Sequence, residues 1–262
     1  MNINIRFCNH FLARTEGLTD EKTIQQRAEV RFLRALYSWY LLDMFNLIPF
    51  NEKESSELPK FKTRPQMYEW LVQDLENLIK DLPEKRINQY RVDKYAAWLL
   101  LARVYLNAEV YTGKAMWAEA KAACEKIYGL GYALAPTYAE VFRGDNGENP
   151  DAKKEMLFAA SYNAEHTQSY GGTTYLTLST LSGDDDAVNM TGINGGWAGN
   201  RVPDHFVQTY FQPSAADFET GEYTIADKRG QLFYIKGRTQ SMQDNLNTFL
   251  NGWSCIKFNN TP

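Results

Sequence analysis

Apolar residues recur at steps of three and four along the first half of the chain, and this period is typical of helices with one buried face. The longest such run spans residues 22–47 and ends before Pro49, which cannot continue a helix. Its apolar positions are Ile24, Ala28, Phe32, Leu36, Trp39 and Tyr40. The pattern predicts one long helix whose apolar stripe packs against other helices.

A second helix is predicted to begin at Thr63, because Thr63-x-x-Gln66 forms a capping box with Pro65 inside the first turn. The helical period then continues as far as Pro83. The apolar positions of this helix are Met67, Leu71, Leu75, Leu78 and Leu82. The second helix can pair with the first as a hairpin.

Two more helices are predicted, one from Asp93 to about Tyr111 and one from Trp117 to Ile127. They resemble a degenerate tetratricopeptide unit, because Leu101-Ala102 and Tyr105 match the repeat's Leu-Gly-x-x-Tyr with Ala in place of Gly. Cys124 lies on the inner face of the last of these helices and is expected in the core. The tryptophans of all four helical patterns are expected there too, namely Trp39, Trp70, Trp98 and Trp117.

The helical period is lost after Gly144, and residues 163–201 are rich in Gly, Ser, Thr, Asn, Asp and Tyr. Short strands are predicted at 155–162 and 232–235, with a short helix at 203–211. The sequence therefore predicts a mostly α fold. Residues 1–143 would form tetratricopeptide-like helical hairpins. Residues 144–262 would form a loop-rich, irregular ligand-binding region with short strands, packed on these hairpins as one structural unit.

The composition narrows the possible functions. The net charge is −4, and acidic and basic residues are interspersed without a basic run, which argues against nucleic acid as a partner. No apolar run approaches the ~20 residues that cross a bilayer. The three cysteines are widely spaced, so neither a disulfide framework nor a zinc site is indicated.

Three blocks, in this order, resemble the SusD-like (RagB/SusD) family. Residues 27–49 contain Arg-Ala-Glu-x-Arg-Phe-Leu-Arg-Ala-Leu-Tyr and close with Phe-x-x-Ile-Pro. Residues 93–113 contain Ala-Ala-x-x-Leu-Leu-Ala-Arg-Val-Tyr-Leu, and residues 117–134 contain Ala-x-x-x-Cys-x-x-Ile followed by Gly-Tyr-Ala-Leu. Residues 196–260 are similar to the family more loosely.

This resemblance implies a surface lipoprotein that binds an oligosaccharide or polysaccharide without catalysis and delivers it to a SusC-type TonB-dependent transporter. It implies a place on the outward face of the outer membrane, with a lipid anchor on an amino-terminal segment that is missing before Met1. The resemblance suggests that the chain covers roughly the middle half of such a protein.

The expected ligand surface lies in residues 162–201. Sugar rings stack on aromatic faces, and their hydroxyls bind to amides, carboxylates and Arg on loops held by a scaffold. The simpler alternative is that these aromatic side chains pack beneath the loop. Further polar residues in the segment are Asn163, Gln168, Asp184, Asp185 and Asn200. The residues predicted to bind ligand are Trp197, Tyr170, Tyr175, Asn194, Arg201 and His166.

Other chemistry finds little support in the sequence. Residues Asp184, Asp185 and Asp186 could bind calcium, but the loop lacks the Asp-x-Asp-x-Asp-Gly pattern, and a solvated turn is the simpler interpretation. No phosphate loop, nucleophile elbow or metal-spaced histidine set is present, so no catalytic residue, metal or cofactor is predicted.

Three hypotheses remain from the sequence. The first is a glycan-binding lipoprotein that is not an enzyme. The alternative is an intracellular tetratricopeptide-type adaptor that grips a peptide in its groove. The third is a carbohydrate-active enzyme on a helical scaffold, for which the acidic residues single out no pair.

Overall fold

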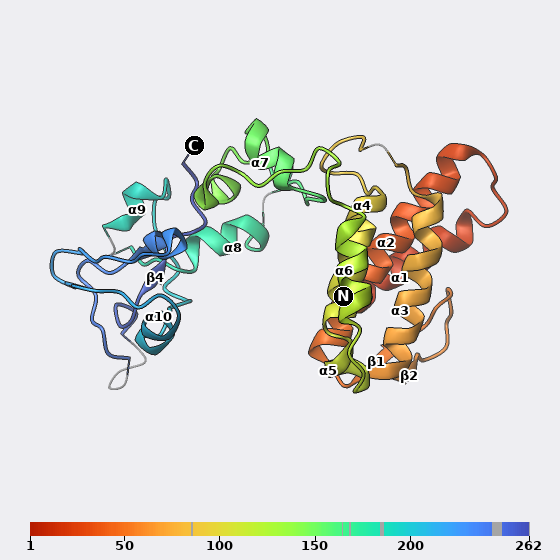
Figure 1. The fold of residues 1–262 in the computed structure, drawn as a ribbon, viewed down its shortest axis with the longest axis horizontal. Coiled ribbons are helices and arrows are strands. Elements are labelled where there is room, and N and C mark those ends of the chain that lie inside the picture. Colours follow the sequence, from red (N-terminus) through yellow and green to blue (C-terminus); the bar gives the residue numbers. More distant parts are fainter. Residues whose placement is uncertain (85, 164, 168, 184–185, 243–247, 262) are drawn as a thin grey trace. The chain divides into compact units, whose positions relative to one another are not determined.

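The computed structural model describes residues 1–84, 86–163, 165–167, 169–183, 186–242 and 248–261 (Figure 1). They form two compact units. The first comprises Met1–Tyr132 together with Met156–Ala159, and the second comprises Ala133–Glu155 together with Ala160–Pro262. The mostly helical fold with a loop-rich second half, expected from the sequence, is confirmed.

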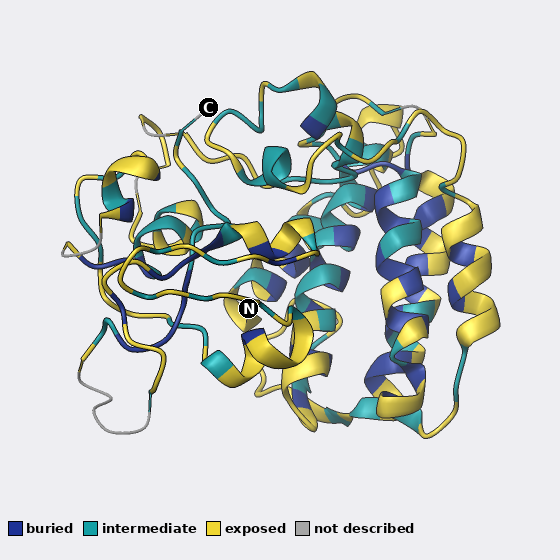
Figure 2. Ribbon diagram, turned by 60° about the vertical axis from the view of Figure 1, so that its left-hand side comes forward, coloured by how far each residue is buried: buried dark blue, intermediate teal, exposed yellow. Residues whose placement is uncertain are grey.

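The first unit is built from helices and one short antiparallel hairpin, β1–β2. Helix α2 packs on α3, and α4 on α6, as in the two predicted hairpins, and α1 packs on α2 in addition. The buried residues of these helices lie on their inward faces (Figure 2). The elements of this unit are α1 (Asn2–Arg14), α2 (Glu21–Met44), β1 (Leu47–Phe50), β2 (Lys60–Thr63), α3 (Arg64–Leu78), η1 (Ile79–Asp81), α4 (Lys94–Leu106), α5 (Ala108–Thr112) and α6 (Trp117–Glu125).

Helix α2 confirms the long helix, but its apolar stripe was only partly predicted. Ala28 and Phe32 are buried, whereas Ile24 and Tyr40 are exposed. The buried face is broader than the predicted stripe and takes in Leu41 and Leu42. The reason is that α2 is covered by α1 as well as by α3, and α1 was not predicted from the sequence.

Helix α3 begins as predicted. The side chain of Gln66 accepts a hydrogen bond from the N–H of Thr63 at 3.0 Å, and the side chain of Thr63 completes the capping box. Leu71, Leu75 and Leu78 are fully buried along its inward face. This helix therefore supplies the centre of the first unit's core.

The predicted helix from residue 93 to 111 is interrupted. Asp93 caps it as expected, but α4 ends at Leu106 and α5 starts at Ala108.

Helix α6 differs from the prediction in which side chains are buried, because Trp117 is 62% exposed and Cys124 is exposed rather than in the core. The inward positions of α6 are Ala120 and Ala123. These small side chains face the core in the helix that packs on α4, and the larger ones are left outside.

The predicted strand at 155–162 is wrong. Residues 156–159 belong to the first unit, where Phe158 meets Phe32 edge to face at 5.5 Å and the N–H of Ala159 donates to the carbonyl of Gln89. The segment docks on the helices, so it does not pair with a strand.

The second unit is irregular, as expected, and has two small buried clusters. Trp253 is fully buried at the centre of one, and its Nε1–H donates to Asp204 at 2.8 Å. The predicted helix at 203–211 and strand at 232–235 are confirmed, but residues 163–201 also contain two short helices. The elements are η2 (Tyr138–Phe142), α7 (Pro150–Glu155), α8 (Gly172–Leu178), α9 (Ala187–Met190), α10 (Asp204–Tyr210), η3 (Lys228–Leu232), β3 (Phe233–Tyr234) and β4 (Ser254–Cys255).

Candidate functional site

Three of the predicted ligand-binding residues come together in the second unit. The ring centroids of Tyr170 and Trp197 are 6.1 Å apart, and those of Tyr175 and Trp197 are 6.4 Å apart, with tilted ring planes in both pairs. The exposed fractions are 87% for Tyr170, 44% for Tyr175 and 41% for Trp197. These three residues, named here the aromatic cluster, therefore keep ring surface open to a ligand.

Glycine at the start of α8, the helix that carries Tyr175, makes room for the ring of Tyr162. Tyr170 precedes the helix and Tyr175 lies on it. Gly172 has a φ of +60°, and a Cβ there would lie 2.4 Å from the ring of Tyr162. The Tyr162 side chain therefore sits directly against the backbone at the beginning of α8.

The position of Trp197 is fixed by its main chain. The N–H of Trp197 donates to the carbonyl of Leu178 at 2.9 Å, and the N–H of Gly199 donates to the carbonyl of Ser179 at 2.9 Å. These bonds satisfy carbonyls that the end of α8 leaves without a helical partner. A Cβ at Gly196 would lie 2.0 Å from the Leu181 carbonyl oxygen, so only glycine allows this close approach.

Asn200 joins the aromatic cluster although it is outside the predicted set. Its Nδ2 donates to the hydroxyl of Tyr175 at 3.0 Å and to that of Ser179 at 3.2 Å. The side chain is exposed and brings an amide oxygen to the edge of the cluster. In the sequence, the only hint of its role is that it lies three residues after Trp197. No pattern distinguishes it from the other amide side chains of the loop.

The other predicted residues lie in local structures of their own. Arg201 donates to the carbonyl of Thr248 at 2.6 Å, and its guanidinium lies 5.8 Å from the centre of the Phe249 ring. His166 is exposed and shares a 3.1 Å hydrogen bond with Asn163 in a turn. Asn194 is exposed on the segment between α9 and Trp197.

The suggested calcium site falls largely outside the described residues, since Asp184 and Asp185 are not among them. Asp186 forms an ion pair with Lys236 at 2.8 Å. Across the part of the chain that the structure describes, no group of three or more His, Cys, Asp or Glu is placed to hold a metal ion. No helix in that part is long and apolar enough to pass through a lipid bilayer.

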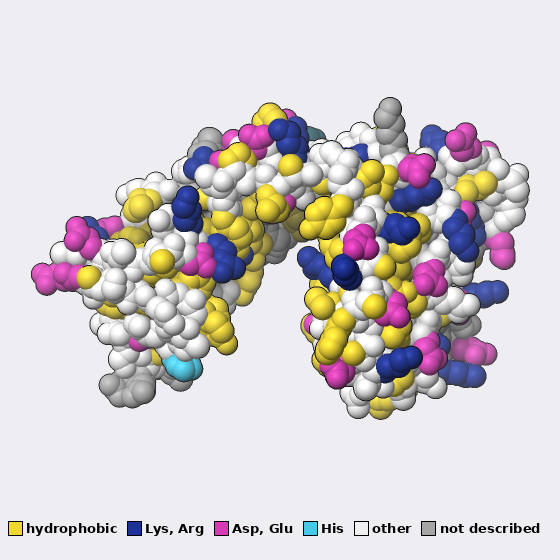
Figure 3. All heavy atoms as spheres, in the orientation of Figure 1, with side chains coloured by type: hydrophobic (Ala, Val, Ile, Leu, Met, Phe, Trp, Pro, Cys, Tyr) yellow, Lys and Arg dark blue, Asp and Glu magenta, His cyan; other side chains and the backbone are white. Residues whose placement is uncertain are grey.

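The surface chemistry agrees with the interspersed charges of the sequence. Basic and acidic side chains alternate over the face that Figure 3 displays, among scattered apolar ones. The aromatic cluster itself offers ring faces, hydroxyl groups and an amide. Such groups bind by stacking and hydrogen bonding, which suits a polyhydroxylated ring with one apolar face.

Comparison with known proteins places the chain in a family. It is 35% identical to the starch-binding protein SusD of Bacteroides thetaiotaomicron, over 96% of this chain and 51% of that protein. A SusD superfamily protein from Parabacteroides distasonis has a similar fold, with a TM-score of 0.68 and 22% identity over 97% of this chain and 53% of that one.

A third similar protein was solved with xylogluco-oligosaccharide. Its TM-score is 0.57 at 20% identity, over 74% of this chain and 39% of that chain. No protein-family model matches the sequence. The chain belongs to the SusD-like family, as its sequence blocks suggested, and it spans about half the length of the curated relative.

Proposed function

We propose that the chain binds an oligosaccharide or polysaccharide through the aromatic cluster, without chemical turnover. The observation that carries the proposal is the convergence of three exposed rings: those of Tyr170 and Tyr175 each lie about 6 Å from that of Trp197, whose segment depends on the close approach of Gly196 to the Leu181 carbonyl. Each ring that stacks on a sugar contributes about 1 kcal/mol, so several rings are needed for useful affinity.

The relatives support the ligand class. SusD is a starch-binding protein by its name, and one structurally similar protein was solved with xylogluco-oligosaccharide. Family membership also favours glycan binding over the adaptor alternative. The same membership supports a lipid-anchored place on the outward face of the outer membrane and delivery of the glycan to a SusC-type TonB-dependent transporter.

Native electrophoresis in gels that contain soluble starch or xyloglucan tests the proposal. A chain that binds either polysaccharide is retarded relative to a gel without it. Trp197→Ala should weaken the retardation, and Trp117→Ala is the matched control, because Trp117 is an exposed tryptophan on α6 in the first unit. Equal retardation of the two variants would show that the polysaccharide binds outside the aromatic cluster.

Incubation of the chain with both polysaccharides tests the absence of turnover. No new reducing ends are expected. Reproducible release of sugar that a single carboxylate substitution abolishes would overturn the non-catalytic part of the proposal.

A further inference from the structure

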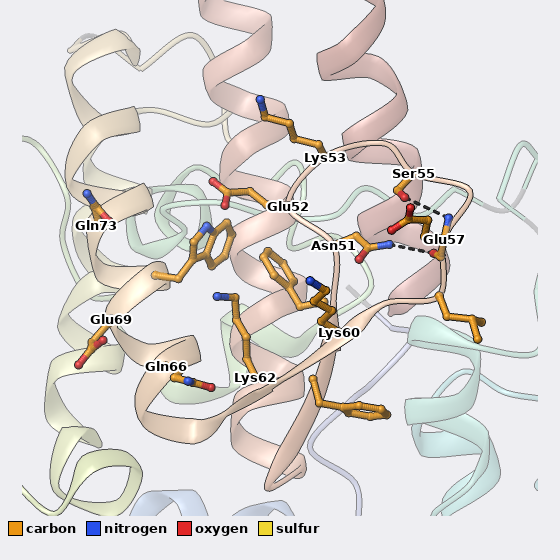
Figure 4. A pocket seen from close by; sticks show the side chains of 14 residues that line it. Asn51, Glu52, Lys53, Ser55, Glu57, Lys60, Lys62, Gln66, Glu69 and Gln73 are labelled. Carbon is orange, nitrogen blue, oxygen red and sulfur yellow. Dashed lines mark hydrogen bonds between the residues drawn. The ribbon is translucent and has the colours of Figure 1, made fainter.

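A second surface lies in the first unit, between the loop that joins β1 to β2 and one side of α3 (Figure 4). This groove, named here the Trp70 groove, has a volume of about 770 Å³, which is within the usual range for small-molecule sites. Its lining has four apolar residues among fourteen, and the other ten are polar. The surface is therefore more polar than a groove for an apolar helix would be.

An aromatic pair forms the apolar part of the groove. The rings of Phe50 and Trp70 are 4.4 Å apart between centroids, with a tilt of 57°. The guanidinium carbon of Arg34 lies 5.1 Å from the centre of the Trp70 ring. Arg34 is buried and does not line the groove, so it supports the ring from the protein side.

A buried network holds that arginine. Arg34 donates to Asn9 at 3.1 Å, to the carbonyl of Glu52 at 2.8 Å and to the carboxylate of Asp74 at 3.2 Å. The bond to Glu52 also fixes the beginning of the loop that walls the groove. The groove is thus pre-organised, which lowers the entropic cost of binding.

Polar side chains face the groove from both sides. Gln66, Glu69 and Gln73 project from α3, and Lys60 and Lys62 come from β2 (Figure 4). Across the described residues, the side chains of Glu69, Gln73 and Lys60 have no hydrogen bond or ion pair within the protein. Amide, carboxylate and ammonium groups of this kind can receive the hydroxyl groups of a sugar.

The balance of charge indicates which ligand fits. Three lysines and three glutamates line the groove, so its formal charge sums to zero. A strongly anionic or cationic polymer would gain little from such a surface. We propose that the Trp70 groove is a second carbohydrate site, which takes a short neutral oligosaccharide against Trp70 and Phe50. It shares no residue with the aromatic cluster, so either site can fail without the other.

The indole N–H signals of the ¹⁵N-labelled chain can test this inference, because each of the six tryptophans gives its own signal. Trp70→Phe and Trp197→Phe identify the two signals of interest. Maltoheptaose and a xylogluco-oligosaccharide are the probes, each titrated to about 10 mM, a concentration that reveals even millimolar affinity. At least one probe should move the Trp70 signal to saturation, in the parent and equally in Trp197→Ala.

A milder variant guards against loss of folding. Gln73→Ala changes an exposed side chain of the groove, and it should weaken the saturation curve of the Trp70 signal about threefold, or ~0.7 kcal/mol, while the Trp197 signal responds as in the parent. A Trp70 signal that stays still with both probes overturns the inference. A mixture of unstructured peptides serves as a third probe. A Trp70 signal that moves only with these peptides also overturns the inference and would assign the groove to a protein partner.

Discussion

Asn200 Nδ2 donates a hydrogen bond of 3.0 Å to the hydroxyl of Tyr175, a residue 25 positions earlier in the chain. The bond ties the segment that carries Trp197 to the helix that carries Tyr175. Two exposed aromatic side chains are thereby held in one arrangement before any ligand arrives. Binding then costs less side-chain entropy than it would with free rings.

Asn200→Ala tests the value of this bond. Tyr175 loses its partner and regains rotamer freedom, so glycan affinity should fall about fivefold, or roughly 1 kcal/mol. The melting temperature should change little because Asn200 is exposed. Calorimetric titration and thermal unfolding give the two quantities. Asn46→Ala, which changes an exposed asparagine of the first unit, is the control, and an equal loss of affinity in both variants would contradict a specific role for the bond.

Gly196→Ala tests the backbone arrangement under Trp197. The added Cβ would meet the Leu181 carbonyl oxygen at 2.0 Å, so the segment must move away from α8. Stability should fall by about 1–3 kcal/mol in chemical unfolding, and glycan binding should weaken as Trp197 shifts. Gly195→Ala is a matched control, since a Cβ there meets nothing within 4 Å. Similar unfolding curves for the two variants would show that the close approach does not matter.

Leu101→Asp tests the helical core. Leu101 is fully buried on α4, so an aspartate there would be an unpaired charge in an apolar environment and should prevent folding. Leu106→Asp places the same charge on an exposed position of the same helix and should leave the circular dichroism spectrum unchanged. A cooperatively melting Leu101→Asp variant would show that this face of α4 is not buried.

Alkaline pH should weaken the first unit through Tyr111. Burial, and then the hydrogen bond to the Asp43 carboxylate, raise the pKa of Tyr111 from its usual value of 10 to about 12. The folded state therefore keeps the proton that the unfolded chain loses, and the resulting stability is fully present below pH 10 and is lost as pH rises through about 12. Tyr111→Phe should flatten the fall in the free energy of unfolding between these pH values. An unchanged slope would contradict the raised pKa.

The helices with a single apolar stripe were the predictable part of the fold. The capping box at Thr63 and the Asp93 cap locate α3 and α4, because local hydrogen bonds determine where a helix starts. Helix α1 was not predicted, since it carries apolar residues on both sides: Ile5 is buried while Ile3 and Phe7 are exposed. Strands of four residues, such as β1, are too short to show a period.

The candidate site was predictable in composition but not in geometry. An aromatic-rich loop after a helical scaffold indicated Tyr170, Tyr175 and Trp197 as candidates. Their convergence depends on Gly196 approaching the Leu181 carbonyl, a tertiary contact that leaves no local pattern. For Trp70 the prediction differed from the structure in the opposite direction. Its helical spacing predicts a buried position in the core, whereas in the structure it is half-buried and lines a groove.

The central claim is that the aromatic cluster binds glycan, and calorimetric titration of the parent, Trp197→Ala and Trp117→Ala with maltoheptaose and a xylogluco-oligosaccharide tests it most directly. The parent should bind at least one sugar with a dissociation constant between about 1 μM and 1 mM, and Trp197→Ala should weaken this about tenfold. Trp117→Ala should bind like the parent, and all three melting temperatures should agree. Undiminished binding by Trp197→Ala, or a large fall in its melting temperature, would contradict an exposed stacking role for Trp197.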